Sequence, residues 1–600
     1  MSMSAEQQDA VTGRTEEEAA GAGTVVARAA RSVAALMPRW VEWKPALRSP
    51  RADLTAGLVV ALVALPLALG FGISSGLGAA AGLATAVVAG AVAAVFGGSR
   101  FQVSGPTGAM TVVLVPIFHE HGASGVLAVG LVAGVVLVVL AFAGIGRAVR
   151  FMPAPVIEGF TAGIAVVIAL QQVPAALGIA HAEGEKVWQS AFDAARQFVD
   201  QPSLLPTVVA VLVAAAILIG GRYLPKLPFS LVAVVVATVV AQLFHLDVTR
   251  IGSIPSGFSA PSLGFLDLGE LTSLLAPALA VAALAALESL LSATAADSMS
   301  VGTRHDPDRE LFGQGLANIA APLFGGVPAT GAIARTAVNV RSGARSRLSA
   351  LTHAVILAGI VYLASPLVAQ IPLAALAGVL LATTVRMVET ASIVAITRAS
   401  RADAIVMTVT FLVTVALDLV TAVAIGVGFA AVLALRAVAK SARIEQVPLD
   451  EEGDHAAEEH ELLREHIVAY RIDGALFFAA AHRFLLELAD VTDVKVVILR
   501  MSRVTAIDAT GALVLKDAIT KLEHRHITVL ISGAKPEHLR PLSALGVFTT
   551  KDSEERHVFA TTPRAIAYAR MLVLPEHRYA QATAGSEGKG PGDTEALPGE

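Results

Sequence analysis

The sequence predicts an all-α polytopic membrane domain of fourteen segments, followed by an α/β domain. Hydrophobic residues make up 55% of the 600 residues and charged residues 16%, against about 25% charged in soluble domains. Long charge-free runs fill the chain up to Lys440, after which the composition is that of a soluble domain. The chain has no cysteine, which excludes disulfide frameworks and thiolate metal sites, and its net charge of −5 argues against a nucleic-acid partner.

Changes in composition divide the chain into five parts. Residues 1–50 are expected to be a partly disordered cytosolic tail, 51–440 the membrane domain, 441–466 a linker, 467–575 the α/β domain and 576–600 a disordered tail. Trp40 and Trp43 lie beside cations, which suits either a segment lying at the lipid headgroups or a plain linker. No signal-peptide pattern precedes the first span, so we expect no removed leader.

The membrane segments are read from the charge-free runs. The run Leu54–Ser99 is about twice the roughly 20 residues that one spanning helix needs, and the sequence SSGLG inside it divides it into two. The further runs are 121–146, 159–182, 201–221, 227–246, 271–287, 311–334, 348–385, 404–417 and 419–435. Some runs hold two helices and some only short ones, which gives fourteen segments.

The positive-inside rule then sets the orientation. With the N-terminus in the cytosol, the inner loops carry 13 cations and the outer loops 3. The inner cations are Arg100, Arg147, Arg150, Arg222, Lys226, Arg304, Arg309, Arg341, Arg345, Arg347, Arg386, Arg398 and Arg401; the outer ones are Lys186, Arg196 and Arg250. The sequence therefore predicts a multi-pass protein of the cell (inner) membrane with both termini in the cytoplasm.

The last part of the chain alternates strands and helices. Ile467–Gly474 is expected to form a strand and turn, Val494–Leu499 and Ile527–Ser532 are expected to be buried strands, and Ala509–Leu522 has a helical pattern. Such alternation is typical of an α/β domain with a covered sheet.

Two short sequence motifs, called here the repeated words, recur in the same order in both halves of the membrane domain. Phe96-Gly-Gly is followed by Thr107-Gly108-Ala109-Met, and Phe324-Gly-Gly is followed by Thr-Gly331-Ala332-Ile333. Each pair opens a short apolar stretch interrupted by Gly and Pro, and paired stretches of this kind mark a transporter site at the bilayer midplane.

Two facing half-helix N-termini offer free N–H groups and positive dipole ends, so they can hold an anion without a lysine. Gly108 and Gly331 would let the anion approach the backbone closely. The alternative is that these glycines only allow tight helix packing.

Ionisable residues inside spans are functional candidates because burying them is costly. Glu288 lies far from both ends of its apolar run, and Ser292 is one turn further on the same face. Glu288 is the candidate coupling residue, with Ser292 as a further oxygen ligand; the alternative is a structural hydrogen bond to a neighbouring helix. Arg335, on the second short helix, could neutralise the anion or pair with Glu288.

Other polar groups are interpreted as structural. His119-Glu120-His121 falls in an expected outer loop without a further ligand and is taken as solvated, and Glu158 and Asp418 as interface or capping residues. No phosphate loop, dinucleotide fingerprint or nucleophile elbow is present. We therefore expect no enzyme activity, no cofactor and no metal site.

Several longer motifs resemble those of the SulP family of anion transporters over residues 50–575. They are DLTAG from Asp53, ALPLA from Ala64, QVSGPTG from Gln102, VIEGFTAG from Val156 and TGAIARTAVN from Thr330. The resemblance implies two inverted seven-helix repeats arranged as core and gate domains, a cytosolic STAS domain (sulfate transporter and anti-sigma-factor antagonist) and a homodimer.

The ALPLA motif is most similar to the cyanobacterial sodium-dependent bicarbonate transporters of the family. That resemblance places Glu288, Ser292, Gly331, Ala332 and Ile333 at the coupling-ion site. Here Glu replaces Asp, Ser replaces Thr, and Ile333 replaces a Thr whose oxygen is lost. Because Na⁺ needs several oxygen ligands and a proton needs one, we predict proton-coupled symport of a small inorganic oxyanion by an elevator-type movement.

Several alternatives stay open at this point. They are Na⁺-coupled bicarbonate transport, a chloride channel or exchanger, and a signalling scaffold built on the STAS domain. The transported anion could be sulfate, bicarbonate, chloride or a dicarboxylate. In the STAS domain, Asp508-Ala509-Thr510-Gly511 matches the family's Asp-Ser-Ser-Gly turn, but Ala509 replaces the serine that is phosphorylated in the antagonists.

Overall fold

The computed structural model describes residues 36–179, 182–184, 186–223, 227–255, 257, 260–300, 304–417, 419–441, 443–447, 466–476, 494–547 and 557–573. The chain divides into two compact units, Met1–Gly428 and Phe429–Glu600, and each is described by itself. The expected disordered ends, most of the expected linker, Lys226 and Asp418 lie outside the described residues.

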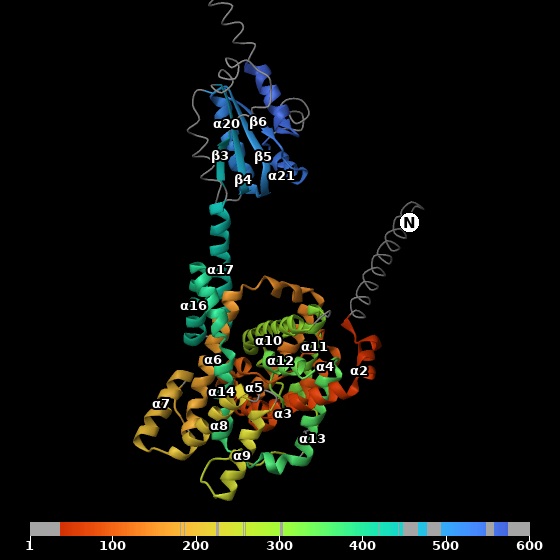
Figure 1. Cartoon of the computed structure of the whole chain (residues 1–600), viewed down its shortest axis with the longest axis vertical. Coiled ribbons are helices and arrows are strands. Elements are labelled where there is room, and N and C mark those ends of the chain that lie inside the picture. The colour runs from red at the N-terminus through yellow and green to blue at the C-terminus, as the bar shows by residue number, and fades with distance from the viewer. Residues whose placement is uncertain are drawn as a thin grey trace, which may run out of the picture. The chain divides into compact units, whose positions relative to one another are not determined.

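The first unit is helical, as predicted (Figure 1). Its helices are η1 Trp40–Trp43, α2 Lys44–Arg48, α3 Pro50–Ser74, α4 Ala79–Phe96, α5 Gly108–Phe142, η2 Ile145–Phe151, α6 Ala154–Leu177, α7 Val187–Asp200, α8 Leu204–Tyr223, α9 Phe229–Leu243, α10 Leu271–Met299, α11 Pro307–Leu323, α12 Ile333–Arg341, α13 Leu348–Val368, α14 Leu373–Met387, α15 Thr390–Ala399 and α16 Arg401–Ala416. Helix α17, Leu419–Ser441, crosses the boundary between the units.

Fourteen helices can be matched to the fourteen predicted segments, although α12 is not apolar overall. Gly122 has φ 65° and ψ −166°, so α5 consists of two helices that meet at a kink. With α5 counted twice and the amphipathic α7 and α15 set aside, α3 to α17 comprise fourteen helices. Within the described residues, nine helices are long and apolar enough to cross a membrane.

The helices of the first unit form two bundles. Helices α3, α4, α5, α10, α11, α12 and α13 pack mainly on one another and are called here the core bundle. Helices α6, α8, α9, α14 and α16 form a gate bundle, and the bundles meet where α3 contacts α9 and α14 and where α5 contacts α6. This division matches the core and gate domains that the resemblance implies.

Asp53, the first residue of the DLTAG motif, anchors the start of the first membrane helix. Its carboxylate is fully buried and accepts hydrogen bonds from the backbone N–H groups of Arg345 and Ser346, at 2.7 and 3.0 Å, and from the Ser346 hydroxyl, at 2.5 Å. A buried carboxylate needs such partners. These bonds fix the start of α3 to the loop before α13.

The second unit contains a five-stranded sheet of order β3-β4-β5-β6-β7 (Figure 1). Its strands are β3 Arg443–Val447, β4 Ile467–Leu476, β5 Val496–Ile507, β6 Thr528–Ser532 and β7 Val558–Phe559, with helices α20 Ala509–His524 and α21 Pro536–Ala544. Strand β3 pairs antiparallel with β4, and the other pairs are parallel. The three predicted strands and the predicted helix are thus confirmed, while β3 and β7 were not expected.

Side chains of β5 alternate between the two faces of the sheet, as strand geometry requires. Val497 and Leu499 pack in one cluster with Leu515 of α20, whereas Val496 and Ile498 pack with the helix over residues 562–573. Both faces are therefore covered by helices, as expected for a largely parallel sheet.

Candidate functional site

The starts of the two predicted half-helices are held together by a short β-ladder. Strand β1, Ser104–Gly105, pairs antiparallel with β2, Thr330–Gly331, and Ser104 lies opposite Gly331. Helices α5 and α12 begin directly after these strands. The two repeated words, more than 220 residues apart in sequence, therefore meet in the core bundle with their helix N-termini adjacent.

Glu288 lies at this meeting point. Its Oε2 atom accepts a hydrogen bond of 2.8 Å from the Thr107 hydroxyl and one of 2.6 Å from the Thr330 hydroxyl. The two hydroxyl oxygens are 3.2 Å apart. The α10 carboxylate is thus linked to the first residue of both repeated words. Thr330 was not predicted as a site residue, although the repeat that pointed to Thr107 contains it.

The anion cradle has fewer free N–H donors than the sequence predicts, because several of its N–H groups already have partners. The N–H of Gly331 donates to the Ser289 hydroxyl at 3.0 Å, and that of Ala332 donates to the Val103 carbonyl at 3.0 Å. In α5, the N–H of Met110 reaches the Thr107 hydroxyl at 3.4 Å. Since the first turn of a helix has no internal acceptors, the donors that remain are those of Gly108 and Ala109 and those at the start of α12, from Ile333.

Gly108 and Gly331 serve packing in the structure, which favours the alternative left open above. A β-carbon on Gly108 would lie 2.2 Å from Cδ1 of Ile168, and one on Gly331 would lie 2.0 Å from Nε2 of Gln102. These neighbouring atoms occupy the place where a side chain would lie at each position. Both glycines allow a close approach of protein atoms to the half-helix starts.

Arg335 brings a buried cation to the same place. Its side chain is 2% exposed, and its Nη2 donates a 2.7 Å hydrogen bond to the Pro106 carbonyl, directly before the first half-helix. Its Nη1 is buried without a hydrogen-bond partner. Of the two roles left open, direct pairing with Glu288 is not seen: within the described residues, Glu288 and Arg335 form no ion pair.

Ser292 is one turn from Glu288 but contacts a different partner. Its hydroxyl donates a 3.0 Å hydrogen bond to the hydroxyl of Thr336, which also accepts from the Val103 N–H at 3.1 Å. Ser292 therefore joins α10 to α12 and to the strand before α5.

A buried polar network, not expected from the sequence, supports the β-ladder from the side of α11. Glu310 is 1% exposed and accepts from the Gln102 amide at 2.7 Å, the Gln314 amide at 3.0 Å and the Ser99 N–H at 2.8 Å. Gln314 also donates to the Ser104 hydroxyl at 2.6 Å. The two parts of the network, residues 99–104 and 310–314, lie over 200 positions apart in sequence, so no local pattern could reveal it.

No cluster of three or more His, Cys, Asp or Glu side chains suited to a metal ion occurs among the described residues. The expected outer loop at His119-Glu120-His121 is wrong, because these residues belong to the end of the first part of α5. The helix continues to the kink at Gly122, where the positive φ suits glycine.

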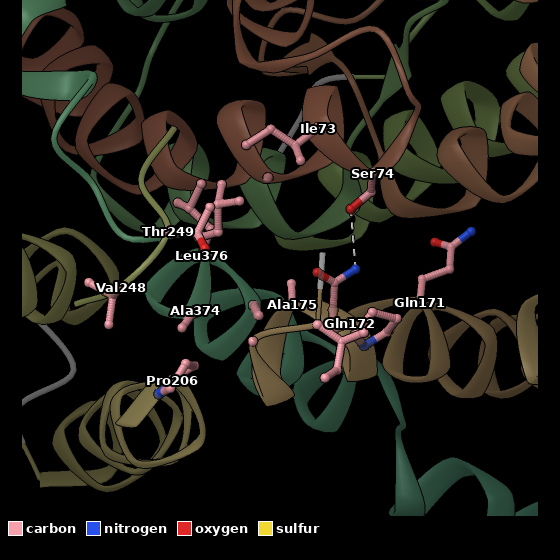
Figure 2. A pocket seen from close by; sticks show the side chains of 16 residues that line it. Ile73, Ser74, Gln171, Gln172, Ala175, Pro206, Val248, Thr249, Ala374 and Leu376 are labelled. Carbon is pink, nitrogen blue, oxygen red and sulfur yellow. Dashed lines mark hydrogen bonds between the residues drawn. The ribbon is translucent and has the colours of Figure 1, made fainter. Parts of the chain in front are cut away.

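Two cavities lie between the core and gate bundles. One of about 320 Å³ lies among α3, α6, α8 and α14, where the Gln172 amide donates to the Ser74 hydroxyl at 3.2 Å (Figure 2). The other, of about 330 Å³, lies among α5, α6, α10 and α16. Neither cavity is lined by Glu288 or by the half-helix starts.

Comparisons with known proteins identify relatives that match most of the chain. YvdB of Bacillus subtilis is 35% identical over 514 residues, which cover 84% of this chain and 95% of that protein. The bicarbonate transporter BicA of Synechocystis is 32% identical over 477 residues, covering 77% of this chain and 84% of BicA.

Solved structures also resemble this chain. The transmembrane domain of a cyanobacterial bicarbonate transporter BicA matches with a TM-score of 0.57 and 34% identity over 62% of this chain and 97% of that one. SLC26A9 matches with a TM-score of 0.77 over 92% of this chain and 95% of that one, and at 16% identity this shows the fold. Residues 462–564 match the STAS domain family. Residues 51–410 match the sulfate permease family, and the chain belongs to that family.

Proposed function

We propose that the protein is a secondary active transporter that carries a small inorganic oxyanion, of the sulfate or bicarbonate class, together with a proton. The observation that carries the proposal is the carboxylate of Glu288, hydrogen-bonded to the hydroxyls of Thr107 and Thr330 where α5 and α12 begin. This places a titratable group beside two helix N-termini.

The proposed binding of an anion rests on a positive electrostatic potential that does not come from surface cations. The free N–H groups at Gly108, Ala109 and Ile333 and the dipoles of the two helices favour an anion. Arg335 adds a full charge just behind Pro106. Such a cradle selects by charge and size, which suits a compact oxyanion.

The proposed proton coupling rests on the hydrogen-bond partners of Glu288. A hydroxyl can both donate and accept a hydrogen bond, whereas a guanidinium can only donate. Thr107 and Thr330 can therefore satisfy the ionised carboxylate and the neutral carboxylic acid alike. A proton could then be taken up and released at Glu288 without leaving a buried polar group unpaired.

Sodium coupling is the second candidate, and one observation favours it. Glu288 Oε2 and the hydroxyl oxygens of Thr107 and Thr330 lie within 2.6–3.2 Å of one another. This supplies more oxygens than the sequence comparison at Ile333 suggested. We rank it below proton coupling because Ser292, the further oxygen ligand predicted for a cation, is bonded to Thr336.

An elevator-type movement of the core bundle against the gate bundle completes the proposal. The cavity of about 320 Å³ (Figure 2) and the one of about 330 Å³ between the bundles leave room for sliding there, while the site itself is built within the core bundle. The homodimer and the cytoplasmic termini remain predictions from the sequence.

Uptake into proteoliposomes tests the proposal. Labelled sulfate, bicarbonate, chloride and a C4-dicarboxylate are each offered with an inward proton gradient, an inward sodium gradient, or neither. We expect accumulation of an oxyanion that follows the proton gradient. Accumulation that follows sodium alone would establish the second candidate, and flux independent of both gradients would indicate a channel.

A further inference from the structure

We propose that the segment before the first membrane helix, η1 and α2 (Trp40–Arg48), binds anionic phospholipid headgroups, and that Glu42 transmits this binding to the core bundle. The occupant is the anionic surface of the leaflet at which α3 begins. This inference concerns lipid regulation and is independent of the transported ion.

The segment lies at the membrane surface because it directly precedes the first membrane helix. Helix α2 ends at Arg48, and the membrane helix α3 begins two residues later at Pro50. Asp53 anchors that start by its buried hydrogen bonds to the loop before α13. The segment is therefore at headgroup level wherever α3 enters the bilayer.

The exposed side chains of the segment suit an anionic membrane surface. Trp40, Val41 and Leu47 are 72%, 65% and 71% exposed. Beside them, four exposed cations form no ion pair within the described residues: Arg39, Lys44, Arg48 and Arg51. Amphipathic rings with adjacent Lys and Arg are typical of segments that lie on anionic lipid, because an anionic leaflet attracts clustered cations.

The acidic residue of the segment points inward and is already neutralised. Glu42 accepts hydrogen bonds from both terminal nitrogens of Arg309, and its carboxylate lies 3.2 Å from Nε of Arg347. Arg309 and Arg347 also donate to the carbonyls of Phe96 and Ala94, at 3.3 and 3.2 Å. Glu42 thus ties the segment to the ends of α4, α11 and α13.

A short series of contacts leads from this tie to the candidate site. Arg309 is followed on α11 by Glu310, which accepts from the Gln102 amide at 2.7 Å. That amide occupies the space beside Gly331, at the start of the second half-helix. Lipid that holds the segment in place therefore stabilises the bundle that carries the site.

Quenching of Trp40 fluorescence tests the lipid contact without any transport measurement. The chain has three tryptophans, so Trp43→Phe with Trp188→Phe leaves Trp40 alone, in nanodiscs of phosphatidylcholine with a fixed fraction of brominated lipid. We expect brominated phosphatidylglycerol to quench at least about twice as strongly as brominated phosphatidylcholine, and the excess to fall with salt. Adding Arg39→Gln, Lys44→Gln and Arg48→Gln should remove the excess.

The matched control removes the same charge elsewhere. Lys521→Gln, Lys535→Gln and Arg540→Gln change exposed cations of the STAS domain and should leave the excess quenching intact. Equal quenching by both lipids in the parent, or an excess that survives the triple change in the segment, would overturn the lipid contact. The second result would mean that groups other than these three cations attract the anionic lipid.

Thermal unfolding tests the transmission through Glu42. Phosphatidylglycerol should raise the unfolding midpoint of the parent protein, as a ligand of the folded state does, by about 3 °C or more. In Glu42→Gln the quenching excess should persist while the rise in midpoint disappears. A rise of parental size in Glu42→Gln would overturn the transmission and leave only an anchor.

Discussion

Two glutamates, Glu42 of η1 and Glu288 of the core bundle, are held in opposite ways. Glu42 accepts hydrogen bonds from Arg309 and faces Arg347, whereas Glu288 accepts from the hydroxyls of Thr107 and Thr330 and has no ion pair within the described residues. Guanidinium partners demand the ionised carboxylate, while hydroxyl partners accept either protonation state. The first arrangement suits a fixed tie and the second suits a group that gains and loses a proton.

The electrostatics of Glu42 agree with its role as a tie. Burial alone raises the pKa of the Glu42 carboxyl, but the hydrogen bond from Arg309 and the charges of Arg347, Arg309 and Arg100 outweigh it. Its pKa therefore lies below the ordinary 4.5. Burial lowers the pKa of Arg347 to about 10, which leaves it charged at neutral pH.

The substitution Glu288→Gln should have the largest effect on transport. It also tests most directly the contrast between Glu288 and Glu42. Because an amide cannot take up a proton at neutral pH, proton-driven uptake by Glu288→Gln should fall to the level of protein-free vesicles. Glu42→Gln is the matched control and should retain proton-driven uptake. Uptake by Glu288→Gln that still follows the pH gradient would assign the proton to another group.

Removing one of the hydroxyl partners should have a smaller effect. Thr330→Val keeps the side-chain volume but loses the 2.6 Å hydrogen bond to Glu288. A hydrogen bond to a charged group contributes about 1.5–3 kcal/mol, so we expect initial uptake rates to fall by about tenfold or more. Thr330→Ser should restore most of the rate, and an unchanged rate in Thr330→Val would mean that this hydroxyl does not act at Glu288.

Glu42 should instead affect stability, with a defined pH dependence. Its carboxyl has a lowered pKa in the folded state, so its contribution is complete above pH 4.5 and is lost as pH falls through the folded-state value. At pH 7, Glu42→Gln should lower the free energy of unfolding by about 1–2 kcal/mol, between the values for exposed and buried pairs. The difference from the parent, followed by thermal unfolding, should narrow below pH 4.5; a constant difference would exclude an ionic tie.

The smallest effect is expected in the STAS domain. The Asp508 carboxylate accepts a 2.7 Å hydrogen bond from the Gly511 N–H at the start of α20. Losing such a cap costs about 1 kcal/mol, so Asp508→Ala should speed hydrogen exchange in the first turn of α20 without changing anion uptake. Loss of uptake would show that this turn acts on the membrane domain, and Asp508→Asn should preserve the protection.

The sequence predicts the helices well because the membrane imposes a strong pattern. Charge-free runs mark spans, and the repeated words mark the half-helices that begin at Gly108 and Ile333. Strands β4, β5 and β6 of the α/β domain follow equally from runs of apolar residues, whereas β3 and β7 do not. These features are local, so single stretches of sequence contain them.

The candidate site was predictable only in part. Glu288 and Thr107 were named, but their bond to Thr330 and the bond of Ser289 to Gly331 depend on packing between distant helices. The glycines were expected to let an anion approach the backbone, and their contacts with Ile168 and Gln102, which belong to other elements, come from tertiary packing. Tertiary contacts of this kind leave no periodic signal in the chain.

The two-residue ladder between Ser104–Gly105 and Thr330–Gly331 has a consequence for biosynthesis. During translation the first half-helix is made more than 220 residues before the strand that pairs with it. The polar groups of Ser104, Thr107 and Gln102 must wait for α10, α11 and β2 before their bonds can form. Assembly of the site is thus a late event in insertion, and a chain truncated before Thr330 would lack the site however many of its helices had entered the membrane.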